Sequence, residues 1–365
     1  MRVLLVGPYP PPYGGLAVQL CEWQRFLAQQ VGYECVIMNI GEYRRASIPG
    51  CMSVSGYWDF VRKLHDFARR GYLVHLLTNG HNVKSWLCSL ACALAGVCNH
   101  RRTVLVFGSG NAPDYVKNSG LLLGVLIRSV IRLGGRLVCR NEHMRQTLIT
   151  YGAAPEKVAI VPGFLGLEVT EQESIPARLQ KILNTQAPVL GATASLDPEY
   201  GIPLMLEAVK ELRKIYPSIW LVIIGPGEEA KGRLSGCEAP DHAYFTGPLS
   251  HAVVLAVMKR LTLFLRPTYF DGDSLSVREA LALGVPVVAS ATDFRPDGVI
   301  TFRKGDLQDF LEKLRHAIEH AAELTAQVRQ LDQCDNTTPL LNIYEDLTSG
   351  TSRVGKARAN GVSTR

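Results

Sequence analysis

The sequence predicts an α/β protein built from two doubly wound, Rossmann-like domains that face each other across a cleft. Three observations predict this fold. Short apolar runs alternate with helical patterns from the first residue on, the runs are apolar throughout, and the alternation restarts after a polar stretch near residue 170. Uniformly apolar strands joined by helices are typical of parallel sheets covered on both faces. The length of 365 residues also exceeds that of a typical single core.

The first domain is expected over residues 1–168. Its strands are predicted at 2–7, 34–39, 72–77, 103–107, 136–140 and 157–162. Helices are predicted at 16–30 and 58–70, where apolar residues recur at helical spacing. A further apolar stretch at 120–135 is too short and too often interrupted by arginine to cross a bilayer.

The polar stretch at 169–187 is expected to link the domains, and the second domain is expected over 188–338. Its strands are predicted at 188–194, 219–225, 261–267, 285–290 and 298–302. Its helices are predicted at 202–216 and 307–324. We expect 339–347 to form a helix that crosses back to the first domain. The tail 348–365 is polar, small and basic, and is expected to be disordered.

Cysteine usage and the amino terminus predict a cytoplasmic protein. The nine cysteines are odd in number and lie mostly in apolar runs, which favours a reducing compartment. Cys88, Cys92 and Cys98 with His100 could bind zinc, but the helical spacing of Cys88 and Cys92 favours core packing. Met1 leads directly into a strand, so no signal peptide is expected.

The net charge of +6 is unevenly distributed. Residues 1–165 hold 18 Lys and Arg against 8 Asp and Glu, and the remainder holds 21 against 25. Arg128, Arg132 and Arg136 recur at four-residue spacing in the basic half. They form either a solvated basic face or a surface that docks on anionic lipid at the inner face of the membrane. Nucleic acid is not expected as a partner, because no stacking aromatics accompany these residues.

The first strand runs into "GPYPPPYGGLAVQL" at residues 7–20. Gly14 and Gly15 open the following helix, where unpaired backbone N–H groups gather at the positive end of the helix dipole. Such a site suits a phosphate. The alternative is a strained β-to-α turn that requires glycine for its backbone angles. Neither a dinucleotide-binding fingerprint nor a P-loop is present.

A second motif, "RPTYFDGDSLSVREALALG", lies at residues 266–284. Ser274 occupies a helix N-cap position, so the amides of Leu275 and Ser276 are expected to point out of the helix start. Glu279 on this helix could accept hydrogen bonds from sugar hydroxyls. Arg278 either balances a phosphate charge, as Arg266 could, or forms a surface or intrahelical salt bridge.

Together these blocks resemble the retaining glycosyltransferases of family 4, which have the GT-B fold. Asp271 and Glu279 are separated by seven residues, and "ALALGVPVVAS" follows them; this spacing resembles the donor-binding signature of that family. The residues "RPT…DGDS.SVREAL" resemble a subgroup pattern. "VGPYPPPYGG", "YLVHLLTNG", "YGAAPEKVAIVPGF", "GATASLDPEYGIPLMLEAVKEL", "WLVIIGPGEE" and "AYFTGPLS" resemble its other blocks. The resemblance covers about residues 1–347.

The resemblance implies a transferase that takes a sugar from a nucleoside diphosphate sugar, without a metal ion or other cofactor. Asp271 and Glu279 are the expected acids of the catalytic site. Glu279 would accept the ribose hydroxyls, and Asp271 would face the donor sugar. The expected donor-binding set is Gly14, Gly15, Arg266, Gly272, Asp273, Ser274, Leu275, Ser276, Arg278 and Glu279.

The sequence departs from the family pattern at several positions. Asp271 stands where glutamate is commoner. The usual arginine and lysine align with Ser195 and Tyr200, and Gly108 stands where an acceptor-site histidine often lies. Gly108, Ser109 and Asn111 are the candidates for the acceptor side. We expect Arg266 and Arg278 to replace the lost positive charge.

Three functions are compatible with these features. The favoured one is a glycosyltransferase that acts on a glycan or lipid-linked acceptor in surface polysaccharide or glycolipid synthesis. The second is a catalytically weak GT-B subunit that binds a sugar nucleotide or a partner protein, which the missing cations favour. The third, a GT-B sugar-nucleotide epimerase, fits the spacing of the acids less well.

Overall fold

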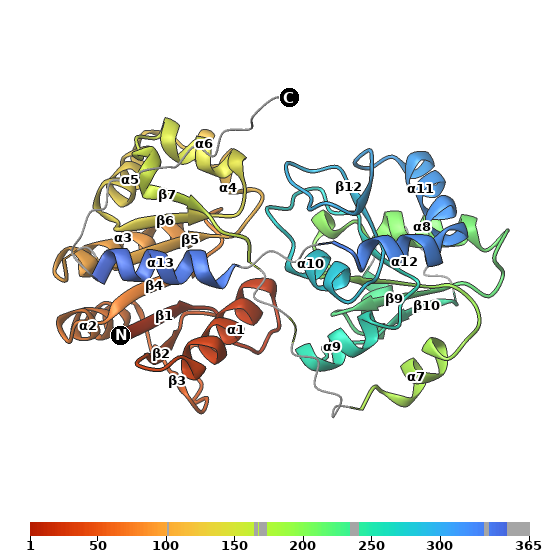
Figure 1. Cartoon of the computed structure of the whole chain (residues 1–365), viewed down its shortest axis with the longest axis horizontal. Helices are drawn as coiled ribbons and strands as arrows, with labels where there is room; N and C mark the ends of the chain where they lie inside the picture. Colours follow the sequence, from red (N-terminus) through yellow and green to blue (C-terminus); the bar gives the residue numbers. More distant parts are fainter. Residues whose placement is uncertain (101, 164–166, 168–173, 234–240, 332–335, 349–365) are drawn as a thin grey trace, which may run out of the picture.

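The computed structural model describes residues 1–100, 102–163, 167, 174–233, 241–331 and 336–348, which form two α/β lobes side by side (Figure 1). The strands of the first lobe are β1 (Arg2–Gly7), β2 (Glu34–Asn39), β3 (Cys51–Met52), β4 (Leu73–Thr78), β5 (Thr103–Phe107), β6 (Arg136–Cys139) and β7 (Val158–Ile160). They form one parallel sheet in the order β3-β2-β1-β4-β5-β6-β7. Its helical segments are α1 (Gly15–Gln29), α2 (Tyr57–Arg69), α3 (Val83–Val97), α4 (Ala112–Lys117), α5 (Leu121–Leu133), α6 (Glu142–Thr150) and the short η1 (Pro155–Lys157).

The second lobe repeats this plan. Its strands are β8 (Val189–Thr193), β9 (Trp220–Ile224), β10 (Ala243–Phe245), β11 (Leu263–Arg266), β12 (Val287–Ser290) and β13 (Val299–Phe302). They pair in parallel in the order β10-β9-β8-β11-β12-β13. Its helical segments are α7 (Ala177–Leu183), η2 (Pro198–Tyr200), α8 (Ile202–Leu212), η3 (Glu228–Arg233), α9 (His251–Met258), α10 (Leu275–Ala282), α11 (Leu307–Glu319) and α12 (Ala321–Val328).

The central strands β1, β4, β5, β8, β9 and β11 are apolar and buried along almost their whole length. Each sheet separates two hydrophobic clusters, one under the helices of each face. Such strands cannot lie at a solvated surface, which is why runs without alternation predicted this fold. The predicted pair of doubly wound domains is confirmed.

Several details differ from the prediction. Strands β3 and β10 were not predicted, because two and three residues are too few to show a period. The helix predicted at 307–324 is interrupted at His320, whose backbone leaves the helical region (φ −108°, ψ 22°). Helix α8 ends at Leu212 and continues only as turns before Pro217, since a residue that precedes proline avoids the helical conformation.

The connection between the domains also holds ordered structure. Within the expected linker, α7 packs its Leu179, Ile182 and Leu183 into the core of the second lobe. The rest of the expected linker up to residue 173 lies outside the described residues, as does the expected disordered tail beyond residue 348.

Helix α13 (Thr337–Thr348) lies over the first lobe, although the chain reaches it from α12 in the second (Figure 1). Leu340, Ile343 and Tyr344 are buried there against β1, α1 and β4. The Trp23 Nε1 donates a hydrogen bond to the Tyr344 Oη at 2.6 Å. The chain therefore crosses between the lobes twice.

Strand order reverses next to β1 in the first sheet and next to β8 in the second. Ligands of open α/β sheets bind beyond the carboxyl ends of the strands at such points. The loops that follow β1, β8 and β11 are therefore the places to look for a site. Among the described residues, no helix combines the length and apolarity that a membrane span requires.

Candidate functional site

A cleft of about 610 Å³ lies between the lobes at these strand ends. From the first lobe it is lined by the loop after β1 and the start of α1, and from the second by the ends of β8, β9 and β11 with the starts of α9 and α10. Of the residues expected at the donor site, the cleft is lined by Gly14, Gly15, Arg266, Ser274, Leu275, Ser276 and Glu279. The predicted residues thus come together from both halves of the chain.

Gly14 and Gly15 begin α1 at the edge of the cleft. Gly14 is extended (φ −98°, ψ 161°), and neither glycine has a positive φ. A Cβ added at either residue would meet no other atom within 4 Å. Neither backbone angle nor packing therefore requires glycine here, which argues against the alternative of a strained turn. The absent side chains instead leave the first N–H groups of α1 open to the cleft.

Helix α10 presents its amino end to the same cleft. The Ser274 Oγ accepts a hydrogen bond from the Val277 amide at 3.4 Å, as expected for an N-cap. Leu275 and Ser276 follow it on the cleft wall. Glu279 lies one turn further in and is only 4% exposed.

The imidazole of His251 accompanies Glu279. Its Nε2 lies 2.6 Å from the Glu279 Oε1, and its Nδ1 lies 3.8 Å from the Glu22 Oε1 of the first lobe. Burial alone would lower the pKa of His251, but the hydrogen bond to Glu279 and the charges of Glu279 and Glu22 outweigh it, so the pKa is raised. Sequence reasoning missed this histidine.

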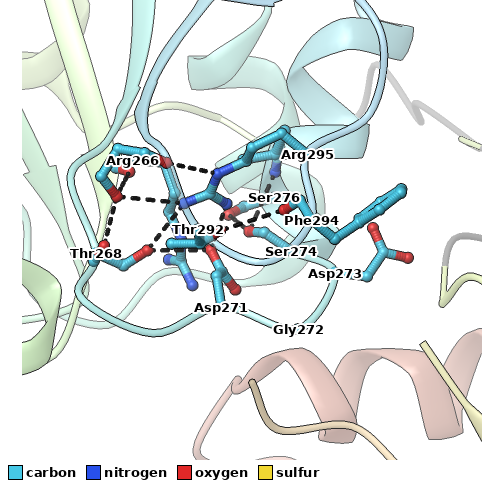
Figure 2. Close-up of polar contacts among 12 residues, drawn as sticks. Arg266, Thr268, Asp271, Gly272, Asp273, Ser274, Ser276, Thr292, Phe294 and Arg295 are labelled. Carbon is cyan, nitrogen blue, oxygen red and sulfur yellow. Dashed lines mark hydrogen bonds and ion pairs between the residues drawn. The ribbon is translucent and has the colours of Figure 1, made fainter. Parts of the chain in front are cut away.

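Asp271 is paired with two arginines (Figure 2). The Arg266 Nε donates a hydrogen bond to the Asp271 Oδ2 at 3.0 Å. The Arg295 NH1 donates to the same oxygen at 2.7 Å. Thr268 Oγ1 donates to the same oxygen at 3.2 Å. Burial alone would raise the pKa of Asp271, but the charges of Arg266 and Arg295 outweigh it and the pKa is lowered. The Asp271 carboxylate is therefore ionised and bound by the two arginines. It was expected to face the donor sugar, but it does not line the cleft.

Asp273 and Arg278 were expected at the donor site but pair with each other away from the cleft. The Arg278 Nε donates to the Asp273 Oδ1 at 2.6 Å, and the Asp273 side chain is fully buried. The Asp273 Oδ2 also accepts from the Gly163 amide, at the end of the first lobe, at 3.3 Å. Since adjacent helix residues point about 100° apart, Arg278 cannot share the cleft-facing side of α10 with Glu279. Arg278 thus lies outside the cleft expected to hold the phosphate, and its salt bridge is buried and reaches a residue before the helix, rather than being on the surface or within the helix.

The loop at Gly108–Asn111 touches the Asp271 loop rather than the cleft. A Cβ on Gly110 would lie 2.3 Å from the Asp271 carbonyl carbon, so only glycine permits this close approach. Gly272 packs against the same loop, and its carbonyl accepts from the Asn141 Nδ2 at 2.8 Å. Gly272 is thus a contact between the lobes and not a lining residue of the cleft.

Of the acceptor-side candidates, Ser109 is engaged with two neighbours. Its Oγ lies 2.7 Å from the His81 Nδ1 and accepts from the Asn111 amide at 3.2 Å. Burial lowers the pKa of His81 despite the nearby charge of Glu199 in the second lobe. Gly108 packs against Leu16 at the start of α1. These residues lie together where the two lobes meet.

The two positions that lack the expected cations have other partners. The Ser195 Oγ donates to the Asp197 Oδ2 at 2.6 Å. The guanidinium of Arg266 lies 5.2 Å from the centre of the Tyr200 ring, within the range of a cation–π contact. Arg266 therefore lies over Tyr200, the residue that stands where the family usually has a lysine.

The described part of the chain contains no candidate metal site. No group of three or more His, Cys, Asp or Glu side chains there is arranged to hold a metal ion. Of the cysteines considered for zinc, Cys92 is buried in the core and Cys98 is exposed. Core packing of Cys92 is thus the observed arrangement.

Part of the chain matches the model of a known protein family. Residues 175–331 match the family model of glycosyl transferases group 1. Most of the second domain therefore resembles this family. A phosphatidyl-myo-inositol mannosyltransferase from Mycobacterium leprae is 28% identical over 173 residues, which are 43% of this chain and 46% of that protein. The chain spans about half the length of the curated relatives it matches.

Solved structures are similar over nearly the whole chain. A sucrose-phosphate synthase from Thermosynechococcus elongatus has a TM-score of 0.71 at 14% identity, over 96% of this chain and 100% of that chain. HepE from Anabaena, solved in complex with UDP-glucose, has a TM-score of 0.69 at 16% identity with the same coverage. Similarity at these identities shows the fold, and the expected GT-B fold is confirmed.

Proposed function

We propose that this chain transfers a sugar from a nucleoside diphosphate sugar to an acceptor, with retention at the anomeric carbon and without a metal ion. The observation that carries this proposal is the buried carboxylate of Glu279 on the cleft wall, one turn after an open helix start. A carboxylate suits ribose hydroxyls, and helix starts suit phosphates. The group 1 family match over residues 175–331 supports it.

Each lobe contributes to the leaving diphosphate in this proposal. The amides at Gly15 in α1 and at Leu275 and Ser276 in α10 supply hydrogen-bond donors, and Arg266 supplies a charge. Such fixed donors favour catalysis when they stabilise charge that grows in the transition state. As the bond between sugar and phosphate breaks, negative charge grows on the diphosphate and positive charge on the sugar. We assign no protein nucleophile.

The test is a panel of UDP-, GDP- and ADP-sugars, assayed for donor hydrolysis and for transfer. HepE was solved with UDP-glucose, so UDP-sugars come first. We expect turnover with one donor class in the presence of a chelator. Loss of all turnover upon chelation, restored by a divalent ion, contradicts metal independence. Inversion of the anomeric configuration in the product contradicts retention.

The absence of cations at Ser195 and Tyr200 favours a second candidate, a catalytically weak subunit that only binds the nucleotide sugar. The same panel separates the two. Binding of a donor without hydrolysis or transfer, with every acceptor tried, supports the second candidate. Turnover supports the first.

We further propose a lipid or lipid-linked acceptor, reached at the inner face of an anionic membrane. The neighbouring helices α3 and α5 expose large aliphatic side chains, here called the α3/α5 face: Leu87, Leu94, Val97, Leu121, Leu122 and Val125, which are 43% to 87% exposed. Exposed apolar patches of this kind mark interaction sites. Arg128 and Arg132 follow on the outer side of α5, whereas Arg136 lies in β6, near Asp346.

Aliphatic side chains beside arginines suit the boundary between acyl chains and anionic headgroups. A relative named for phosphatidyl-myo-inositol supports a lipid acceptor. We expect sedimentation with phosphatidylglycerol-containing vesicles that weakens at high salt. The variant Leu121→Asp/Leu122→Asp should lose binding, while Val31→Asp, at an even more exposed aliphatic residue, should keep it. Equal binding to neutral vesicles contradicts the electrostatic part of the proposal.

A further inference from the structure

The pairing of Arg266 and Arg295 with one carboxylate leaves an unbalanced charge. Their side chains are 13% and 6% exposed, and that of Asp271 is 9% exposed. Among the described residues, Asp271 is the only carboxylate within ion-pair distance of either guanidinium. The three side chains, here called the arginine cluster, therefore carry a net charge of +1 in a mostly buried place.

Hydrogen bonds to neighbouring residues orient the arginine cluster (Figure 2). The Arg295 Nε donates to the Ser290 carbonyl at 3.0 Å, and its NH2 donates to the Thr268 Oγ1 at 3.2 Å. The Arg266 NH1 donates to the Thr193 carbonyl at 3.2 Å. Two backbone carbonyls and one threonine hydroxyl thus set the orientation of the two guanidinium groups.

Only one member of the arginine cluster reaches the cleft. Arg266 lines it, beside Ser274 and Ser276 at the start of α10, whereas Arg295 and Asp271 lie behind. The cation–π contact with Tyr200 holds the Arg266 guanidinium on the cleft side. An anion that enters the cleft therefore meets Arg266 and the amides of α10 together.

Arg295 decides how much of the Arg266 charge such an anion experiences. An isolated Arg266–Asp271 pair would be neutral, and its attraction for a phosphate would largely cancel. With Arg295 on the same carboxylate oxygen, Asp271 is neutralised from behind. The positive charge of Arg266 then remains available to the cleft.

We propose that Arg295 is a positioning residue for the donor diphosphate: it neutralises Asp271 so that Arg266 supplies the cationic charge that Ser195 and Tyr200 lack. This inference rests on the proposed function, since it assigns the diphosphate subsite of that donor. It replaces the expected partnership of Arg266 and Arg278 with one of Arg266 and Arg295.

The test compares UDP with uridine, because only UDP carries the diphosphate; GDP or ADP with its nucleoside replaces the pair if the wild type prefers that base. Arg266→Gln and Arg295→Gln should each weaken UDP binding roughly tenfold in calorimetry and leave uridine binding unchanged. Asp271→Asn should not weaken UDP binding, since it removes a negative charge. The double variant Asp271→Asn/Arg295→Gln again has a net charge of +1 and should recover UDP affinity.

Two controls separate charge from structure. Arg295→Lys keeps the charge and should retain the preference for UDP over uridine. Arg303→Gln removes an arginine that is 76% exposed and should change neither affinity. Each variant is first compared with the wild type by circular dichroism and thermal unfolding.

The outcomes are distinct. Undiminished UDP binding by Arg295→Gln overturns the inference while leaving the proposed function intact. An equal loss of UDP and uridine binding overturns it too, because Arg295 would then support the fold alone. Failure of the double variant or of Arg295→Lys to retain UDP preference also contradicts the charge argument. A wild type that binds no UDP, GDP or ADP overturns the proposed function and this inference with it.

Discussion

The imidazole of His251 bridges two acids, Glu279 of its own lobe at 2.6 Å and Glu22 of the other lobe at 3.8 Å. One ring thus joins the acid assigned to the ribose with helix α1 of the first lobe. Arg25 also lies near and opposes protonation of the ring, while pairing with Glu22 at 2.7 Å. The bridge is strongest when His251 carries a proton.

The first prediction is that His251 stabilises the protein more at low pH than at high pH. Its folded-state pKa is raised above the ordinary value near 6.5, so its contribution is fully present below that value. The contribution is lost as pH rises through the folded pKa. The decrease in melting temperature caused by His251→Gln should therefore be larger at about pH 5.5 than at about pH 8.5.

His316→Gln is the matched control, because that ring lies on α11 and contacts the ring of His320 rather than Glu22 or Glu279. Comparison of the two variants separates the contact with Glu279 from the loss of a histidine as such. A decrease for His251→Gln that is independent of pH, or that grows toward high pH, contradicts the assigned protonation.

The second prediction concerns recognition of the nucleoside. Glu279→Gln keeps the shape of the side chain but removes the charge that strengthens hydrogen bonds from ribose hydroxyls. The affinity for UDP should fall roughly tenfold to a hundredfold, as for the loss of a hydrogen bond to a charged group. Pyrophosphate has no ribose, and its affinity should not fall.

Calorimetric titration of both ligands provides the measurement. Glu312→Gln is the control, since the Glu312 side chain is 73% exposed. If Glu279→Gln weakened pyrophosphate as much as UDP, the carboxylate would support the cleft rather than read the ribose.

The third prediction concerns the contact between the lobes at Asp273. This buried carboxylate binds Arg278 at 2.6 Å. Burial lowers the pKa of Arg140 in the first lobe to about 10, and the negative charge of Asp273 acts against this shift. Asp273→Asn leaves the Arg278 guanidinium without its carboxylate and removes a negative charge near Arg140, which costs about 3–5 kcal/mol. We expect the first unfolding transition to shift to lower urea and the radius of gyration to increase as the lobes separate.

Small-angle scattering and urea titration together check this effect. Asp66→Asn, at a carboxylate that is 52% exposed and pairs with Arg70, should change neither quantity. An unchanged scattering curve for Asp273→Asn would show that other contacts hold the lobes.

Much of the fold could be predicted because its determinants are local. An unbroken apolar run predicts a central strand such as β1, and Ser274 predicts the start of α10. Strands β3 and β10 show no such pattern, because their two and three residues are ordered by pairing with β2 and β9. Because the side-chain repeat of a strand is two residues, two or three residues are too few to establish a pattern.

The site was predicted where its residues share one element and missed where they do not. Glu279 and Ser274 lie on one helix, so their spacing places them. Arg295 lies 24 residues from Asp271 and His251 lies 28 residues from Glu279, and each comes from a different loop or helix. Only the sheet order brings such partners together. The position of Arg278 could have been predicted, since its neighbour Glu279 faces the cleft.

The final prediction concerns helix α13 and the buried hydroxyl of Tyr344. The Trp23 Nε1 donates to this oxygen at 2.6 Å, and the His75 Nδ1 contacts it from the other side. Burial lowers the pKa of His75 to about 3, so its ring is neutral at physiological pH. Because the hydroxyl accepts from Trp23, it donates its own proton to the His75 Nδ1.

Tyr344→Phe removes this hydroxyl and leaves the Trp23 donor and the His75 acceptor without partners, while the His75 Nε2 already has no hydrogen-bond partner among the described residues. Each orphaned buried group costs about 1–3 kcal/mol, so the free energy of unfolding should fall measurably in urea titration. Tyr57→Phe, at a side chain that is 54% exposed, should have little effect. His75 is neutral from about pH 6 to about pH 8, so the loss of unfolding free energy should be the same at both values. The effect of His251→Gln, in contrast, should change with pH. A loss that varied between these pH values would mean that His75 is charged in the folded protein.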